Sequence, residues 1–236
     1  MRFNVKITII YGTQRKSKSS TYNIAQQFII QLSEGDSVSE FFMPKSMPNF
    51  CRGCWQCFTD FTKCPDYEYL DPIVGAMRDA DLLIFTAPVY VYHVPGQLKA
   101  FLDHFGYRWM PHQPMKEMFC KQALLISTAA GAGTKSTLKD LKDSMTFWGV
   151  ARIHSYGKNT NAADWDTVNE KKKLQFQKDI EIISAKIKAK SRNVKPSLKV
   201  KGLFYAMRFM QKKFHFNPAD VQYWQAQGWL EKTRPW

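Results

Sequence analysis

Residues 5–11 of the chain read VKITIIY, and Gly12 follows them directly. Such a run of apolar, mostly β-branched residues is typical of a strand that helices cover on both faces, as in a parallel sheet. After a polar loop, residues 21–32 (TYNIAQQFIIQL) carry apolar side chains at helical spacing. The chain therefore opens with a strand, a loop and a helix, which is the repeating unit of an α/β protein.

The following residues repeat this unit. Further strands are predicted at residues 38–43, 81–87, 122–128 and 151–156, and further helices at residues 71–79, 96–105, 136–147 and 166–190. Strands that alternate with helices pair in parallel through right-handed crossovers, so we predict an α/β fold: a three-layer sandwich with a five-stranded parallel sheet. Ligands of such sheets bind beyond the carboxyl ends of the strands, which directs attention to the loops after the first, third and fourth strands.

The positive charge of the chain is concentrated near its carboxy terminus. The 236 residues carry a net charge of +14, and the segment from Lys171 to Trp236 holds 16 Lys and Arg against 4 Asp and Glu, a net +12. We therefore predict a domain over residues 1–190 and a basic helical extension over residues 191–236. Because the first 170 residues are close to neutral, nucleic acid is not the expected partner of the domain.

The location of the protein is predicted from its apolar runs and its cysteines. No stretch reaches the ~18 apolar residues that a membrane span needs, and the first residues lack the apolar core of a signal peptide. Five cysteines, four of them between positions 51 and 64, do not fit the disulfide framework of a secreted domain. We expect a cytoplasmic protein with reduced cysteines.

The loop after the first strand, residues 12–21 (GTQRKSKSST), contains hydroxyls and three cations but no acid, and it leads into a helix. Backbone N–H groups, hydroxyl donors and the positive end of the helix dipole would serve a phosphate there. The alternative is a solvated basic loop in which Ser19 or Ser20 caps the helix. The residues of this loop alone leave both interpretations open.

Residues 88–103 (PVYVYHVPGQLKAFLD) make the prediction more specific. This stretch resembles the loop and helix that wrap the flavin ring in the NAD(P)H-dependent FMN reductase and iron-sulfur flavoprotein family of the flavodoxin-like superfamily. Residues 12–21 are similar to the phosphate loop of that family, and residues 128–133 (TAAGAG) to its third flavin loop. The resemblance covers roughly residues 3–160 and implies a flavodoxin-like sandwich that binds FMN.

The resemblance also implies which residues hold FMN. A flat ring needs close backbone approach, which Gly131 and Gly133 would permit. No side chain is predicted as a catalytic acid, base or nucleophile, and His93 is interpreted as a surface residue. The phosphate would lie at Thr13, Arg15, Ser17, Ser19, Ser20 and Thr21, and the ring at Pro88, Val89, Tyr90, Val91, Thr128, Ala129, Gly131 and Gly133.

Four cysteines form a compact cluster in the loop 49–66. Soft thiolate ligands select iron-sulfur clusters or zinc. The spacing Cys51-x2-Cys54-x2-Cys57-x6-Cys64 resembles the cysteine motif of iron-sulfur flavoproteins, which implies a [4Fe-4S] cluster on these four residues. Zinc and a metal-free loop remain as alternatives. Cys120 stands apart and is predicted to pack in the core.

The basic extension contains two predicted helices. Residues 203–214 place apolar side chains at helical spacing among lysines and arginines, which fits either an arm that packs on its own domain or a second subunit, or a helix on an anionic membrane surface. We favour packing. Residues 217–230 (NPADVQYWQAQGWL) indicate a capped helix that docks through its tryptophans.

The predicted function is that of an enzyme. FMN would take a hydride from NADH or NADPH and pass electrons to a small-molecule or protein acceptor, with the cluster as an intermediate carrier. A homodimer or higher homo-oligomer is expected from the resemblance. The alternatives are a non-enzymatic flavodoxin-like electron carrier and a zinc-binding nucleic-acid or membrane-surface module.

Overall fold

The computed structural model describes residues 5–33, 37–191, 193–215 and 217–236. Its centre is one sheet of five parallel strands in the order β2-β1-β3-β4-β5, which confirms the predicted α/β fold. The strands are β1 (Ile7–Tyr11), β2 (Val38–Phe42), β3 (Leu82–Pro88), β4 (Gln122–Ala129) and β5 (Arg152–Asn159).

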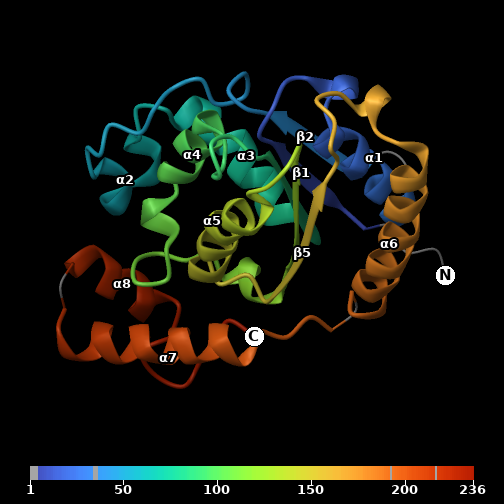
Figure 1. Ribbon diagram of the computed structural model, residues 1–236. Coiled ribbons are helices and arrows are strands. Elements are labelled where there is room, and N and C mark those ends of the chain that lie inside the picture. Colours follow the sequence, from blue (N-terminus) through green and yellow to red (C-terminus); the bar gives the residue numbers. More distant parts are fainter. Residues whose placement is uncertain (1–4, 34–36, 192, 216) are drawn as a thin grey trace.

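Helices cover both faces of the sheet (Figure 1). One face carries α1 (Ser20–Leu32) and α6 (Glu170–Ala189), and the other carries α3 (Tyr67–Asp79), α4 (Gly96–Asp103) and α5 (Thr134–Phe147). Alternate side chains of β4 enter the two layers: Leu124 packs on the side of α1, and Leu125 on the side of α5. All eight residues of β4 are buried, which explains the continuous apolar run in the sequence.

The register of the strands brings their carboxyl ends to one edge. Tyr11 at the end of β1 pairs with Thr86, and Pro88 at the end of β3 pairs with Thr128. The chain moves from β1 to β2 on one side and then crosses to β3 on the other, so the direction of winding reverses between β1 and β3. A ligand is expected at this point, beside the loops that leave the strands.

The cysteine-rich loop lies between β2 and α3. It contains the short helix α2 (Gln56–Thr59) and a 3-10 turn (Phe61–Lys63). Helix α3 begins at Tyr67, four residues before the predicted start, so Pro72 lies in its second turn and not at its beginning. Helix α6 begins at Glu170, later than predicted, because the side chain of Asn169 caps it by accepting from Lys171 N at 2.9 Å.

The carboxy-terminal extension packs on the domain. Its helices are α7 (Leu198–Lys213) and α8 (Pro218–Ala226), and they lie at the end of the molecule opposite the loop after β1 (Figure 1). Phe204, Trp224 and Trp229 are buried against Met110 and Phe119, which belong to the connection between α4 and β4. Within the described part of the chain, no helix is long and apolar enough to cross a membrane.

One prediction about the core is wrong. Cys120 is exposed, because it ends a 3-10 helix (Lys116–Cys120) that turns its neighbours Met118 and Phe119 inward instead. Its Sγ lies 3.7 Å from the carbonyl oxygen of Pro235.

Candidate functional site

A cavity of about 210 Å³ opens at the carboxyl edge of the sheet. The loops that follow β1, β3, β4 and β5 all contribute to its wall. The lining residues are Thr13, Arg15, Ser19 and Ser20 from the first loop and the start of α1, Pro88, Val89 and Tyr90 from the end of β3 and its loop, Thr128, Ala129 and Ala130 from the end of β4 and its loop, and Thr160, Ala162 and Ala163 from the loop after β5.

The loop after β1 presents a helix amino terminus to this cavity. Ser19 is the N-cap of α1, but its side chain makes no capping hydrogen bond, and the first turn of α1 contains no acid. Ser19 Oγ is instead 2.8 Å from Thr21 Oγ1. The N–H groups of the first turn therefore retain their capacity to bind an anion, and the hydroxyl of Ser20 lies beside them.

Arg15 joins the first loop to the loop after β5. Its guanidinium donates to the carboxylate of Asp164 and, over 3.2 Å, to the carbonyl oxygen of Ala163. Both side chains of the ion pair are about half exposed. Arg15 thus forms part of the rim of the cavity.

Two predicted residues of the first loop do not line the cavity. Ser17 is exposed in a 3-10 turn (Lys16–Lys18), and its carbonyl oxygen accepts from Asn23 Nδ2 at 2.6 Å. Thr21 is fully buried behind Ser19. The roles of both residues in phosphate binding stay predictions.

The loop after β3 makes a tight turn beside the cavity. Tyr90 and His93 exchange two backbone hydrogen bonds of 3.0 Å, and the residues between them, Val91 and Tyr92, have φ angles of 47° and 65°. Two successive positive φ angles are the geometry of a type I′ turn. Tyr90 faces the cavity, whereas Val91 is 93% exposed at the tip of the turn and does not line it. His93 is an exposed hydrogen-bonding residue, 2.9 Å from Asp140.

The glycines of the loop after β4 have different surroundings. A Cβ atom on Gly133 would lie 2.6 Å from Val89 Cγ1, and the φ angle of Gly133 is 102°. Gly133 therefore allows the loops after β3 and β4 to pack together, although it does not line the cavity itself. Around Gly131, the described residues place no atom within 4 Å of such a Cβ.

The loop after β5 also lines the cavity, although no motif in its sequence predicted this. Thr160 N donates to the carbonyl oxygen of Ala129 at 2.8 Å, and Thr160 Oγ1 donates to that of Ala162 at 3.1 Å. The predicted topology could have indicated this loop. The fifth strand is parallel to the others and ends at the same edge of the sheet, so the residues that follow it also reach the ligand site.

The donor set of this cavity fits FMN. Hydroxyls, a helix amino terminus and a guanidinium at one end are suited to a phosphate dianion. The cavity is smaller than the 300 Å³ or more of a typical cofactor pocket, so the enclosed part suits the phosphate and sugar chain. The ring would extend past Tyr90 at the open rim.

A second cavity, of about 200 Å³, is lined by all four clustered cysteines. Cys51 and Cys54 are exposed, and Cys57 and Cys64 are partly buried. Across the described ranges, no three His, Cys, Asp or Glu side chains lie close enough together to hold a single metal ion.

The cavity changes the acidity of its thiols. Burial, together with the nearby Cys64 and Cys51, raises the pKa of Cys57 to about 11. Burial also raises the pKa of Cys64. Without a cation these groups are protonated thiols at neutral pH, so a bound metal centre would displace their protons.

Tyr107 places a polar atom in the wall of the cysteine cavity. Its ring is buried, and its hydroxyl has no hydrogen-bond partner among the described residues. Burial raises the pKa of Tyr107, the adjacent Arg108 guanidinium lowers it in part, and Cys57 and Cys64 raise it, so the hydroxyl stays protonated near these sulfurs. A buried hydroxyl without a partner costs free energy, and a sulfur acceptor in the cavity would satisfy it.

A buried pair anchors the cysteine loop to α4. His104 Nε2 is 3.1 Å from Asp66 Oδ2, and His104 Nδ1 is 2.8 Å from the carbonyl oxygen of Ala100. Asp66 Oδ1 accepts from Asn49 Nδ2 at 2.7 Å. Through these contacts the imidazole ties the residue that precedes α3 to the carboxyl end of α4.

Comparison with known proteins places the chain among flavin enzymes. The profile of the NADPH-dependent FMN reductase family matches residues 5–164. An iron-sulfur flavoprotein of Methanosarcina thermophila is 28% identical over 168 residues, which are 70% of this chain and 87% of that protein. An FMN-dependent NADH:quinone oxidoreductase of Desulfotalea psychrophila is 24% identical over 64% of this chain and 82% of its own length.

Solved structures share the fold. An azoreductase from Bacillus anthracis has a TM-score of 0.60 and 14% identity, and the match covers 77% of this chain and 99% of that one. An FMN-dependent NADH-azoreductase from Bacillus anthracis, solved in complex with FMN, has a TM-score of 0.58 and 13% identity over 76% of this chain and 98% of its own. At sequence identities of 13–14%, the similarity to these structures supports the fold alone.

Proposed function

Because the chain belongs to the NADPH-dependent FMN reductase family, as its loop sequences predicted, we propose that it binds FMN in the cavity at the carboxyl edge of the sheet. Family membership makes it an FMN-dependent oxidoreductase that uses a nicotinamide. The observation that carries the placement is the convergence of four strand-end loops on one cavity with phosphate-binding groups. When bound, FMN supplies the hydride and electron chemistry.

The residues of the chain bind and orient the cofactor. The amino terminus of α1 and the hydroxyls of Ser19 and Ser20 hold the phosphate, with Arg15 at the rim. Tyr90 and the segment 128–130 border the ring. The lining set of this cavity contains no carboxylate, thiol or imidazole, so hydroxyls, backbone groups and Arg15 supply its polar contacts.

The four cysteines form the proposed second redox centre. We propose that Cys51, Cys54, Cys57 and Cys64 hold a [4Fe-4S] cluster, because they line one cavity and because the relatives matched over most of their length include iron-sulfur flavoproteins. The family match favours this enzyme over a flavodoxin-like carrier or a zinc module.

A homodimer or higher homo-oligomer is part of the proposal. The turn beside the flavin cavity exposes apolar area that an adjoining subunit would cover: Tyr90, Val91 and Tyr92 are 45%, 93% and 62% exposed. Sedimentation analysis of the purified protein measures this state directly.

Anaerobic absorption spectroscopy tests the proposed redox centres. The protein reconstituted with FMN should show flavin bands that bleach on addition of NADPH or NADH. A broad shoulder at longer wavelength that bleaches afterwards would support the cluster. If neither nicotinamide bleaches the flavin, the proposed function is wrong.

A further inference from the structure

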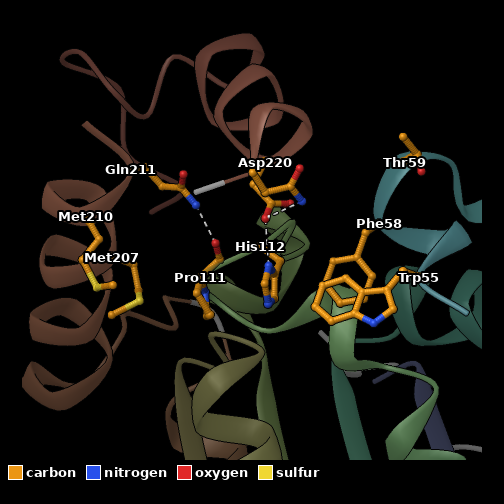
Figure 2. A pocket seen from close by; sticks show the side chains of 10 residues that line it. Trp55, Phe58, Thr59, Pro111, His112, Met207, Met210, Gln211 and Asp220 are labelled. Atoms are coloured by element: carbon orange, nitrogen blue, oxygen red, sulfur yellow. Dashed lines mark hydrogen bonds and ion pairs between the residues drawn. The ribbon is translucent and has the colours of Figure 1, made fainter. Parts of the chain in front are cut away.

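A third cavity, of about 500 Å³, lies where the carboxy-terminal extension meets the cysteine-rich loop. Figure 2 shows α7 on one side of it and the aromatic side chains of the cysteine-rich loop on the other. It shares no lining residue with the flavin cavity. Its main lining residues are Trp55, Phe58, His112, Met207, Met210 and Asp220.

This cavity adjoins the cysteine cavity. Trp55 and Phe58 line both spaces. They follow Cys54 and Cys57 directly in the sequence, and their rings stack with centroids 4.5 Å apart and an interplanar angle of 29°. A molecule in the larger cavity would therefore contact the same aromatic side chains that line the cysteine cavity.

The walls of the cavity suit a planar apolar molecule. Trp55 and Phe58 offer ring area on one side, and Met207 and Met210 offer flexible thioethers on the other (Figure 2). A volume of about 500 Å³ lies in the range of small-molecule sites.

A histidine supplies the polar group of the cavity. His112 Nδ1 is 2.8 Å from Asp220 Oδ2, and the Asp220 side chain is 2% exposed. The carboxylate accepts the Nδ1 proton, which orients the ring, and Nε2 has no hydrogen-bond partner among the described residues. Asn217 Nδ2 also donates to Asp220 Oδ2, at 3.0 Å. When protonated, His112 can donate from Nε2 to a carbonyl oxygen in the cavity.

We propose that this cavity binds the electron acceptor of the enzyme, and that the acceptor is of the quinone class: a planar apolar ring with carbonyl oxygens, one of them at His112. The proposal rests on the proposed function, since the electrons come from NAD(P)H. In the overall reaction, NAD(P)H, a proton and the quinone give NAD(P)⁺ and the hydroquinone. The C–H bond of the nicotinamide breaks as a hydride, which carries two electrons and one proton, a second proton comes from solvent, and two O–H bonds form on the quinone.

Binding of menadione (2-methyl-1,4-naphthoquinone) to the oxidised, FMN-loaded protein tests this assignment by titration calorimetry. Met210→Trp and Thr59→Trp fill the cavity from opposite walls, so each should weaken binding by about tenfold or more, which corresponds to ~1.4 kcal/mol. Phe209→Trp is the matched control, because Phe209 is 58% exposed on α7 and does not line the cavity.

Each result decides the assignment. The assignment is supported if a cavity-filled variant that is as thermally stable as the wild type binds menadione weakly, while Phe209→Trp binds it normally. The assignment is overturned if menadione does not bind the wild type, or if it binds all variants equally. Bleaching of the wild-type flavin by NADPH is recorded separately, so failure of the proposed function is distinguished from failure of the acceptor site.

Discussion

The guanidinium of Arg15 donates to the carboxylate of Asp164, 149 residues further along the chain, and so connects the loop after β1 to the loop after β5. The sequence pointed to Arg15 as a phosphate ligand, whereas the structure pairs it with an acid at the rim of the same cavity. A half-exposed ion pair contributes roughly 1 kcal/mol or less, so a phosphate dianion competes readily for this cation.

Two substitutions distinguish these roles of Arg15. Arg15→Gln removes a charge-assisted hydrogen bond to phosphate and should weaken FMN binding by about tenfold or more, from ~1.5–3 kcal/mol. Asp164→Asn, its matched control, removes the competing acid and should leave FMN affinity unchanged or raise it. Fluorescence titration measures both, and an equal loss in the two variants would show that the ion pair acts by holding the loops together.

Gly133 is predicted to be essential for the shape of the flavin site. Gly133→Ala brings a Cβ against Val89 and forces alanine to a φ angle of 102°, which costs at least about 1–2 kcal/mol. We expect lower thermal stability and weaker FMN binding. Gly202→Ala on α7 is the control, since its Cβ would meet no described atom within 4 Å and Gly202 lies outside the flavin cavity, so neither property should be reduced. Equal behaviour of the two variants would contradict the close packing of these loops.

Cys54 is predicted to be a cluster ligand. Cys54→Ala should remove the long-wavelength shoulder of the anaerobically reconstituted protein and its iron, and leave the flavin bands. Cys120→Ala serves as the control, because Cys120 is exposed and lies outside the cysteine cavity. Iron analysis and absorption spectra provide the measurement. An unchanged iron content in Cys54→Ala would rule out the proposed ligand set.

Substitution of Tyr107 should affect the metal-free protein and the cluster-loaded protein differently. The Tyr107 hydroxyl meets no partner within hydrogen-bond geometry among the described residues, but the Arg108 guanidinium lies beside it, so Tyr107→Phe should change the stability of the metal-free protein by no more than about 1.5 kcal/mol. In the cluster-loaded protein the same change removes a donor to sulfur, and the reduction potential should fall. Thermal unfolding and a redox titration measure the two effects. A potential that stays constant would mean that the hydroxyl does not contact the cluster.

The fold followed from local patterns in the sequence. Buried parallel strands such as β4 are apolar on both faces, so they stand out as continuous runs, and the loops after β1, β3 and β4 were found at their ends. Strand β5 is only partly buried, and residues 160–164 carry no marked pattern, so the fourth loop of the site was not predicted. The pairing of Arg15 with Asp164 depends on contacts between distant segments, which no local pattern contains.

The packing of the carboxy-terminal extension also depends on contacts between distant segments. The apolar stripe predicted over residues 203–214 includes Phe204, which is fully buried on α7, and Phe214, which follows α7 and is 49% exposed, so spacing alone did not show which side would dock. The docking depends on Trp224 Nε1, which donates to the carbonyl oxygen of His112 at 2.7 Å, and on the His112–Asp220 pair. These contacts also create the cavity between α7 and the cysteine-rich loop.

The central claim is that loops at the carboxyl edge of the sheet hold FMN by its phosphate and its ring. Fluorescence titration of the cofactor-free protein with FMN and with riboflavin, which lacks the phosphate, tests this most directly. We predict that FMN binds and that riboflavin binds at least about a hundredfold more weakly, as expected for the loss of two or more charge-assisted hydrogen bonds. Equal affinity for both ligands, or no binding of FMN, would contradict the account.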